Sequence, residues 1–339
     1  MVSLEQELPS HWIVTVSGLV SLGRRLPISI DTNLERARDG NGNPSTITYD
    51  VEDALGAGPI KTPTLTVPLY TERLNGSYQQ ITSIESIANS TYQAGMIKVA
   101  RYGGHGLSLH AHYLYAHATD WNPNESGQVA GNDVLDPADF RLEYGTSNLD
   151  IRHSAGATVL YAVPWKLRSW EGVLADGWSV AGVGQFRTGL PYTMRTSGYL
   201  PGYYDSGTLI DGVAPGINGS GGDNRLYSIG RNTYRYPSTY TGDARLAKRF
   251  NLARSRQLEL LAESFNLFNH QNVTLIETTG YYVYRGAVAG GPPTLNFMTG
   301  LTKAGLPSLT TVEFGKPLNV NATNFYRPRE IQLGVKARF

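Results

Sequence analysis

Two histidines stand two residues apart in the segment from Leu107 to Tyr115, in which every second residue is apolar or aromatic. An alternation with a period of two is typical of a β-strand, so His110 and His112 would project from the same face. Two imidazoles on one face could bind a metal ion, but a protein metal site needs further ligands. No third ligand has a spacing that fixes it, so the favoured interpretation is a polar strand face without a metal or cofactor.

A second candidate is the segment Asp39-Gly-Asn41-Gly-Asn43, which resembles the start of a calcium-binding loop with Asp50 at its twelfth position. The sixth position of such a loop is glycine and the twelfth is usually glutamate, whereas this sequence has Pro44 and an aspartate. The favoured interpretation is an Asx-rich surface turn, and weak Ca²⁺ binding in an outer loop is the alternative.

The remaining chemically reactive residues form no catalytic pattern. Gly182-Val-Gly184 lacks the third glycine and the following helix of a dinucleotide site, and no nucleophile has a base in a supporting context. The formal net charge of +1 argues against a nucleic-acid partner, and the lack of cysteine excludes a disulfide framework. We therefore expect a protein that is not an enzyme.

Charged side chains occupy alternate positions in several segments. In the last ten residues, Ile331, Leu333 and Val335 share one face, and charged residues share the other. A strand with one apolar and one charged face suits a position between lipid and a water-filled lumen. The charged residues predicted to face the lumen are Asp150, Arg152, Asp243, Arg245, Arg249, Glu330, Lys336 and Arg338.

These residues have two interpretations. They could contact a solute or a plug inside a barrel, or they could be hydrated by a polar interior. Contact with a plug is favoured, because a filled barrel would otherwise bury the charges without partners.

Nine alternating segments follow one another, and the lengths of their connections alternate. Short turns follow Leu8, Arg101, Val163 and Phe250, and long loops follow Leu22, His117, Thr196 and Phe268. All the long loops would therefore lie at one end of the strands. Outer-membrane barrels have this asymmetry, with short periplasmic turns and long extracellular loops. The predicted fold class is all-β, an antiparallel transmembrane β-barrel.

Two regions depart from simple alternation. In the segment 257–268, one parity holds both charged and apolar residues, which predicts a β-bulge at a position that the sequence does not assign. These residues are Glu259, Leu261, Glu263, Phe265 and Leu267. The loops at about 26–90, 196–238 and 269–326 are rich in glycine, proline and polar residues. We expect these loops to be irregular and to carry the specificity for a ligand.

Nine is an odd number of strands, and an open sheet would leave unpaired edges in lipid. We therefore expect residues 1–339 to form a single domain that is the C-terminal portion of a larger barrel. The apolar run Trp12–Leu22 follows acidic Glu5 and Glu7 rather than basic residues, so it is predicted to be a strand and not a signal peptide.

Several segments resemble the C-terminal half of TonB-dependent outer-membrane receptors, in particular the Oar-like group. The most specific are Leu261-Ala-Glu-Ser-Phe-Asn-Leu-Phe-Asn269 and Pro328-Arg-Glu-Ile-Gln-Leu-Gly-Val-Lys-Ala-Arg-Phe339. The others are Gly23-Arg-Arg-Leu-Pro27, Asp31-Thr-Asn-Leu34, Asp150-Ile-Arg-His-Ser-Ala-Gly156, Gly177-Trp-Ser-Val-Ala-Gly182, Thr188-Gly-Leu-Pro-Tyr192 and Arg231-Asn-Thr-Tyr-Arg-Tyr236. Together these segments span nearly the whole chain.

The resemblance implies a 22-stranded barrel that holds an N-terminal plug and is energised through a TonB box. We expect no plug, TonB box or signal peptide within residues 1–339, so TonB would act through a missing N-terminal region. The resemblance also implies that the barrel-assembly machinery reads the terminal Phe339, in the outer membrane of a Gram-negative-type bacterium. The expected function is import of a solute that the sequence does not identify. The alternatives are a passive or surface-binding outer-membrane barrel, and a secreted β-sandwich enzyme or lectin.

Overall fold

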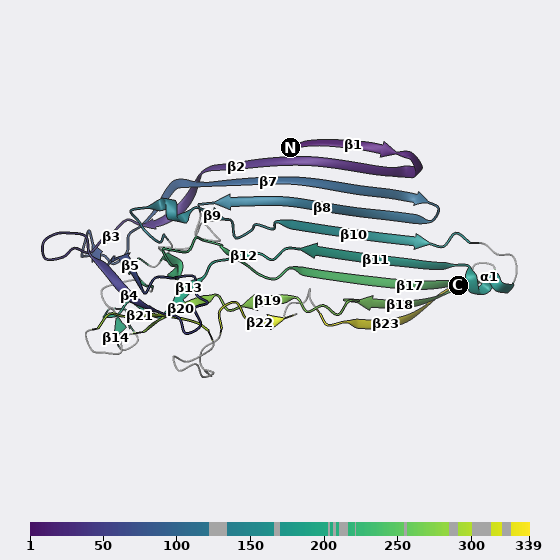
Figure 1. Ribbon diagram of the computed structural model, residues 1–339. Helices are drawn as coiled ribbons and strands as arrows, with labels where there is room; N and C mark the ends of the chain where they lie inside the picture. Colours follow the sequence, from purple (N-terminus) through teal and green to yellow (C-terminus); the bar gives the residue numbers. More distant parts are fainter. Residues whose placement is uncertain are drawn as a thin grey trace.

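Nine long antiparallel strands form one continuous sheet in the computed structural model of the chain (Figure 1). The structure describes residues 1–121, 134–165, 170–202, 204–205, 208–209, 216–220, 222–253, 256–284, 291–299, 313–320 and 327–339. In spatial order, the strands are β1 (Val2–Leu8), β2 (Trp12–Asp31), β7 (Thr82–Gly104), β8 (Leu107–Asp120), β10 (His153–Ala162), β11 (Trp178–Arg187), β17 (Thr239–Ala253), β18 (Arg256–Phe265) and β23 (Glu330–Arg338). This order follows the chain, as the predicted succession of nine strands requires, and the short β9 (Gly145–Thr146) pairs beside β8. No helix among these described residues is long and apolar enough to cross a membrane.

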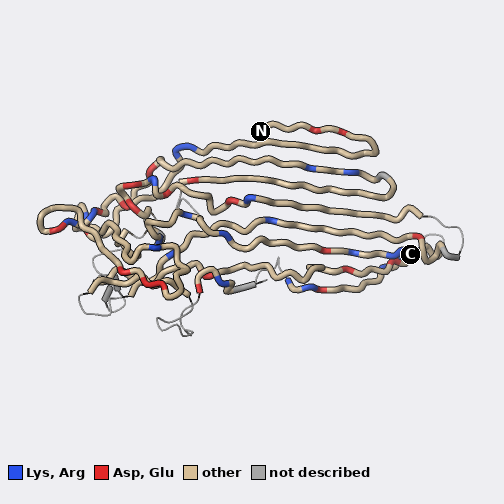
Figure 2. The backbone as a smooth tube through the Cα atoms, viewed as in Figure 1, with Lys and Arg blue, Asp and Glu red and all other residues tan. Residues whose placement is uncertain are grey.

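The register between strands gives the sheet one apolar and one charged face, because cross-strand partners project from the same side. On β17, Asp243, Arg245 and Arg249 share a face with Glu259 and Glu263 of β18. Lys336 and Arg338 of β23 continue this charged face. Figure 2 shows charged residues sparsely along the strands and more densely at the end where the long loops gather.

The expected β-bulge within residues 257–268 is wrong. β18 keeps an unbroken register with β23 from Gln257 to Phe265, so Leu261 projects from the charged face and lies opposite Gly334. A register shift occurs instead in β17, between Asn251 and Ala253, beside the turn to β18. The alternation looks broken in the sequence because Leu261 and Phe265 share this face with Glu259 and Glu263.

The connection between β10 and β11 is longer than the short turn predicted after Val163. It contains helix α1 (Trp170–Ala175), which lies at the end of the sheet opposite the long loops (Figure 1). Lys248 of β17 lies on the apolar face here, and its ammonium donates 2.9 Å to the carbonyl of Leu174 and also to that of Asp176. The ammonium also lies 5.3 Å from the centre of the Trp178 ring. These contacts satisfy a cation on an otherwise apolar face.

The four long loops fold together into one structure, which we call the loop cap. It comprises the described parts of residues 32–81, 121–152, 188–238 and 266–329. Three of these loops contribute to a five-stranded sheet made of β13 (Arg195–Ser197), β20 (Thr279–Tyr284), β21 (Thr294–Phe297), β4 (Thr46–Glu52) and β5 (Thr64–Pro68). Tyr49, Met194, Leu226, Tyr281 and Leu295 form a buried apolar core from the same three loops. The expectation of irregular loops is therefore wrong, because this core stabilises strands that are too short to show a sequence pattern.

Shorter elements complete the loop cap. Paired two-strand ladders are β3 (Leu34–Glu35) with β6 (Glu72–Arg73), β12 (Pro191–Tyr192) with β16 (Tyr234–Arg235), β14 (Tyr204–Asp205) with β15 (Thr208–Leu209), and β19 (Val273–Ile276) with β22 (Pro317–Val320). The 3-10 turns are η1 (Pro9–His11), at the opposite end of the sheet, and η2 (Phe140–Glu143) and η4 (Gly222–Asn224) within the cap.

β2 and β7 also extend further than predicted. They remain paired up to Asp31 and Thr82, with register shifts near Leu26, through residues that were assigned to the first loop. Ile28 and Ala88 in this extension are buried against Val134 of the 121–152 loop. Contact with the loop cap therefore allows these strands to continue beyond the amphipathic segment.

Candidate functional site

A cavity of about 590 Å³ lies where the loop cap meets the ends of β11 and β17. This volume falls within the usual range of small-molecule sites. Its walls come from the 188–238 loop, from β19 and from Asn148 of the 121–152 loop. Arg187 and Thr239, which pair across β11 and β17, line it from the charged side of the sheet. We call this cavity the cap pocket.

The ladder of β12 and β16 builds the aromatic wall of the cap pocket. Tyr192 stacks on Tyr234 with ring centres 5.6 Å apart and meets Tyr236 edge-on at 5.4 Å. Gly189 permits this approach, since a Cβ atom there would lie 1.8 Å from the carbonyl oxygen of Tyr236. Burial raises the pKa of Tyr192 to about 12, so its phenol is neutral at physiological pH.

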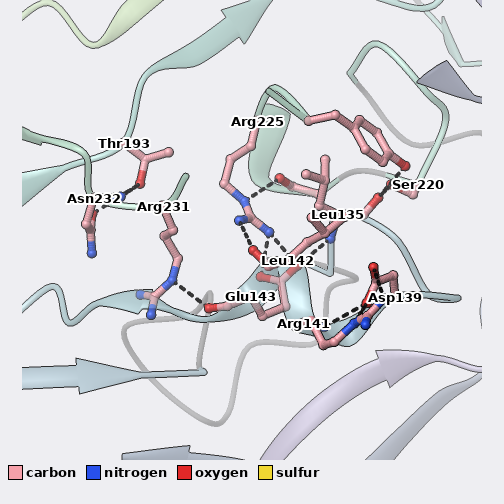
Figure 3. Close-up of polar contacts among 12 residues, drawn as sticks. Leu135, Asp139, Arg141, Leu142, Glu143, Thr193, Ser220, Arg225, Arg231 and Asn232 are labelled. Carbon is pink, nitrogen blue, oxygen red and sulfur yellow. Dashed lines mark hydrogen bonds and ion pairs between the residues drawn. The ribbon is translucent and has the colours of Figure 1, made fainter. Parts of the chain in front are cut away.

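Arg231 lies in a buried wall of the cap pocket. Its side chain is 2% exposed, and its Nε donates to the Glu143 carbonyl oxygen at 3.1 Å (Figure 3). Its Nη2 pairs with Asp120. Its Nη1 is enclosed but has no hydrogen-bond partner among the described residues. Burial lowers the pKa of the guanidinium, although the Asp120 carboxylate opposes this shift. An enclosed donor without an acceptor is costly, so the site is suited to a ligand or solvent acceptor.

The rest of the lining is polar and carries further cations. Arg187 Nε donates 3.1 Å to the Thr239 hydroxyl, and Arg195 lines another part of the cap pocket. Thr274 of β19 contributes a second enclosed polar atom, a hydroxyl without a partner among the described residues. No carboxylate belongs to the described residues that line the cavity.

Buried ion pairs hold the loops around this cavity. Arg225 donates to both carboxylate oxygens of Glu143 at 2.5 Å, and Figure 3 shows Arg225 and Arg231 reaching Glu143 from two sides. Asp150 is buried and accepts hydrogen bonds from Arg235 and from the Ala118 N–H. Burial alone would raise the pKa of Asp150, but these hydrogen bonds hold it below its ordinary value.

The structure separates the residues predicted to face a lumen into two groups. Asp150 and Arg152 lie before β10 rather than on it, and they join the buried polar network of the loop cap. Their expected place on a strand face is wrong, because β10 begins only at His153. The second group comprises the predicted residues of β17 and β23, which share the charged face. On this face Arg245 lies 3.7 Å from Glu263, and Arg249 lies 3.9 Å from Glu259.

The other sequence candidates lie outside the cap pocket. His110 and His112 line a separate depression on the charged face together with Asp243. No group of three or more His, Cys, Asp or Glu side chains among the described residues could hold a metal ion. Asp39 forms an Asx turn by accepting from the backbone N–H groups of Asn41 and Asn43. Glu330 begins β23, and Phe339 follows it with 91% of its surface exposed.

A family model described as an outer membrane beta barrel domain matches residues 1–282. The chain belongs to this family. A search of curated proteins finds no match. The family assignment confirms the predicted all-β barrel fold class and places the protein in the outer membrane. It also excludes the secreted β-sandwich alternative.

Membership of an outer-membrane barrel family indicates which environment each face of the sheet meets. Strands of such barrels turn an apolar band to lipid and a polar face to the interior. Leu246 of β17 and Val335 of β23 lie on the apolar face, opposite the charged one. The cap pocket meets the sheet on its charged side, through Arg187 and Thr239.

Sequence reasoning did not identify Arg187, Arg195, Arg231 or Thr274 as site residues. Two of the segments that carry the family resemblance, 188–192 and 231–236, contribute opposite strands of the same ladder beside the cavity. Both segments contain tyrosines close to an arginine, Arg187 or Arg231, and this composition is the sequence signal that could have indicated a shared site. Nothing in their spacing of about forty residues indicates that they pair.

Proposed function

We propose that this outer-membrane barrel imports a solute as the C-terminal portion of a TonB-dependent, Oar-like receptor. The observation that carries the proposal is the cap pocket, which lies between the folded loops and the charged face of the sheet. A solute bound there would stand at the mouth of the barrel interior. Barrels in the outer membrane commonly bind ligands at such a position.

The charged face is proposed to contact the plug of such a receptor. Arg245 and Glu263 form a cross-strand pair there, and both side chains remain partly exposed. An exposed pair on an interior face can exchange partners with a plug without breaking the sheet. TonB would act on that plug, and no catalytic step is proposed for this chain.

Uptake by living cells tests the proposal. Cells with the intact gene, cells without it and cells with inactivated TonB are grown on the same mixed medium, and solute depletion is followed by mass spectrometry. We expect one solute to remain in the medium of both defective strains. A solute that still binds to TonB-deficient cells and is taken up at the normal rate would contradict active import and favour a passive barrel.

The surface-binding alternative gives a different result in the same cells. A surface binder would retain its ligand on intact cells without transport, and TonB inactivation would leave that binding unchanged. DNA upstream of this chain that encodes a plug and a TonB box in the same reading frame would support the receptor.

A further inference from the structure

The geometry of the cap pocket points to an anionic solute, one that presents a carboxylate or a phosphate to Arg231. This inference deepens the proposed function, since it names the chemical class that the same site would bind. It rests on three observations: the enclosed Nη1 of Arg231, the two further arginines in the lining, and the absence of carboxylates from the described lining residues.

Arg231 is a fixed donor rather than a mobile surface cation. Its Nε and Nη2 are held by Glu143 and Asp120, so the guanidinium plane has a defined orientation. Nη1 is the remaining nitrogen, and it is enclosed in a cavity wall without a described partner. A guanidinium with a fixed plane is well suited to the oxygens of a carboxylate or phosphate.

Arg187 and Arg195 extend the positive character of the cap pocket toward accessible parts of the lining. Both residues are exposed, whereas Arg231 is buried, so the pocket offers guanidinium groups at more than one depth. Cations around a concave site attract an anion before it docks. A neutral solute would gain less from this arrangement than an anion, and a cationic one would be repelled.

The walls around the arginines suit a flat body that carries the anionic group. Tyr192 and Tyr236 present aromatic surface on one side, and Thr274 offers a hydroxyl from β19. Asn232 is held by the Thr146 carbonyl at 2.7 Å, which keeps its part of the lining in place. The cap pocket therefore combines rigid apolar walls with a few oriented polar groups, as small-molecule sites do.

Matched aromatic probes test the inference on the purified full-length receptor in detergent. Benzoate and phenyl phosphate carry the two anionic groups, and benzamide has nearly the shape of benzoate without its charge. We expect calorimetry to show at least one anion binding about 10-fold or more tightly than benzamide, the effect of one charge-assisted hydrogen bond. The stronger of the two anions identifies the group that the pocket prefers. Equal affinities for all three probes, or binding of none, would overturn the inference.

Arginine variants test whether the anionic probes bind in the cap pocket. We expect Arg187→Gln and Arg195→Gln each to weaken anion binding about 3- to 10-fold, and Arg231→Gln to weaken it more. Arg249→Gln is the matched control, because Arg249 lies on the same charged face outside the cap pocket. Anion binding that survives all three pocket variants, or that falls equally in the control, would overturn the assignment. Arg231 also holds two loops together, so limited proteolysis of Arg231→Gln must show that its loop cap is intact. If the cap is not intact, the variants at the exposed Arg187 and Arg195 test the site.

Failure of this inference and failure of the proposed function can be told apart. Binding by the purified protein requires no TonB, so tight anion binding without TonB-dependent uptake would contradict only the proposed import. TonB-dependent uptake of a neutral solute, together with no anion binding, would contradict only the anionic class.

Discussion

Arg225 and Glu143, which are 82 residues apart, form an ion pair inside the loop cap. Their side chains are 1% and 0% exposed, and Nη2 of Arg225 lies 2.5 Å from both carboxylate oxygens. Glu143 also accepts from the Leu135 N–H at 2.8 Å, and Arg225 Nε donates to the Gly222 carbonyl at 3.1 Å. The pair therefore joins the 121–152 loop to the 188–238 loop, beside the wall that contains Arg231.

Replacing Arg225 with methionine should loosen the loop cap but leave the barrel strands folded. The variant buries the Glu143 carboxylate without its partner, which typically costs about 3–5 kcal/mol. We expect amides of residues 134–152 and 222–236 to exchange hydrogen faster, while those of β8 and β11 stay protected.

A double variant supplies the control for this prediction. Glu143→Gln together with Arg225→Met removes both charges, so it should be less destabilised than Arg225→Met alone. Equal exchange in the single and double variants would show that lost packing, and not the unpaired carboxylate, accounts for the effect.

Gly189→Ala should disrupt the aromatic wall of the cap pocket. The added Cβ would meet the Tyr236 carbonyl oxygen at 1.8 Å, a backbone atom that cannot move without separating β12 from β16. Overpacking of this kind typically costs about 1–3 kcal/mol. Gly184→Ala is the control, since nothing lies within 4 Å of its added Cβ. The prediction fails if the two variants show the same thermal stability and the same binding of the anionic probes.

The loop cap should lose stability in acid through Asp150. Its folded-state pKa is lowered by the N–H of Ala118 and by Arg235, although burial opposes this. The stabilising contribution is therefore fully present above the unfolded-state pKa, about 4, and is lost as pH falls through the lower folded-state value. Asp150→Asn should be less stable than the native chain at neutral pH and should show a shallower loss on acidification. Parallel pH profiles of proteolytic susceptibility in the two proteins would contradict the assignment to Asp150.

Arg245→Glu tests the proposed contact between the charged face and a plug. Arg245 and Glu263 are 37% and 32% exposed and 3.7 Å apart, so reversing one charge should cost the barrel only about 1 kcal/mol or less. In a complete receptor, we expect normal amounts of heat-modifiable barrel, with weaker protection of the plug from protease and reduced uptake. Arg245→Lys keeps the charge and should behave like the native protein. Unchanged plug docking and uptake in the reversal variant would rule out the contact.

Deleting Phe339 from a complete receptor should impair its assembly. Phe339 follows β23 directly, its surface is 91% exposed, and its position continues the parity of the apolar Val335 and Ala337. We expect a lower amount of heat-modifiable barrel in outer-membrane fractions, and Phe339→Tyr should restore it by keeping an aromatic terminus. Normal assembly of the deletion variant would contradict the proposal that the barrel-assembly machinery reads Phe339.

The sequence by itself determined the strands, their antiparallel succession and the charged face that holds Arg245, Arg249 and Lys336. A membrane strand must turn apolar side chains to lipid at every second position, so its pattern is local and can be read from ten residues. The same reasoning predicted a bulge in β18 that is absent, because Leu261 and Phe265 on the charged face look like a change of register.

Only the tertiary structure decided the loop cap and its pocket. Arg187 ends the ten-residue strand β11, which the sequence predicted, but Thr274 lies in the four-residue β19 and Arg231 lies just before the two-residue β16. Segments of two to four residues have no recognisable period, and the buried core and the ion pairs between loops stabilise them instead. Asp150 shows the same limit: its charge was visible in the sequence, but its place beneath the loops depends on Arg235, 85 residues away.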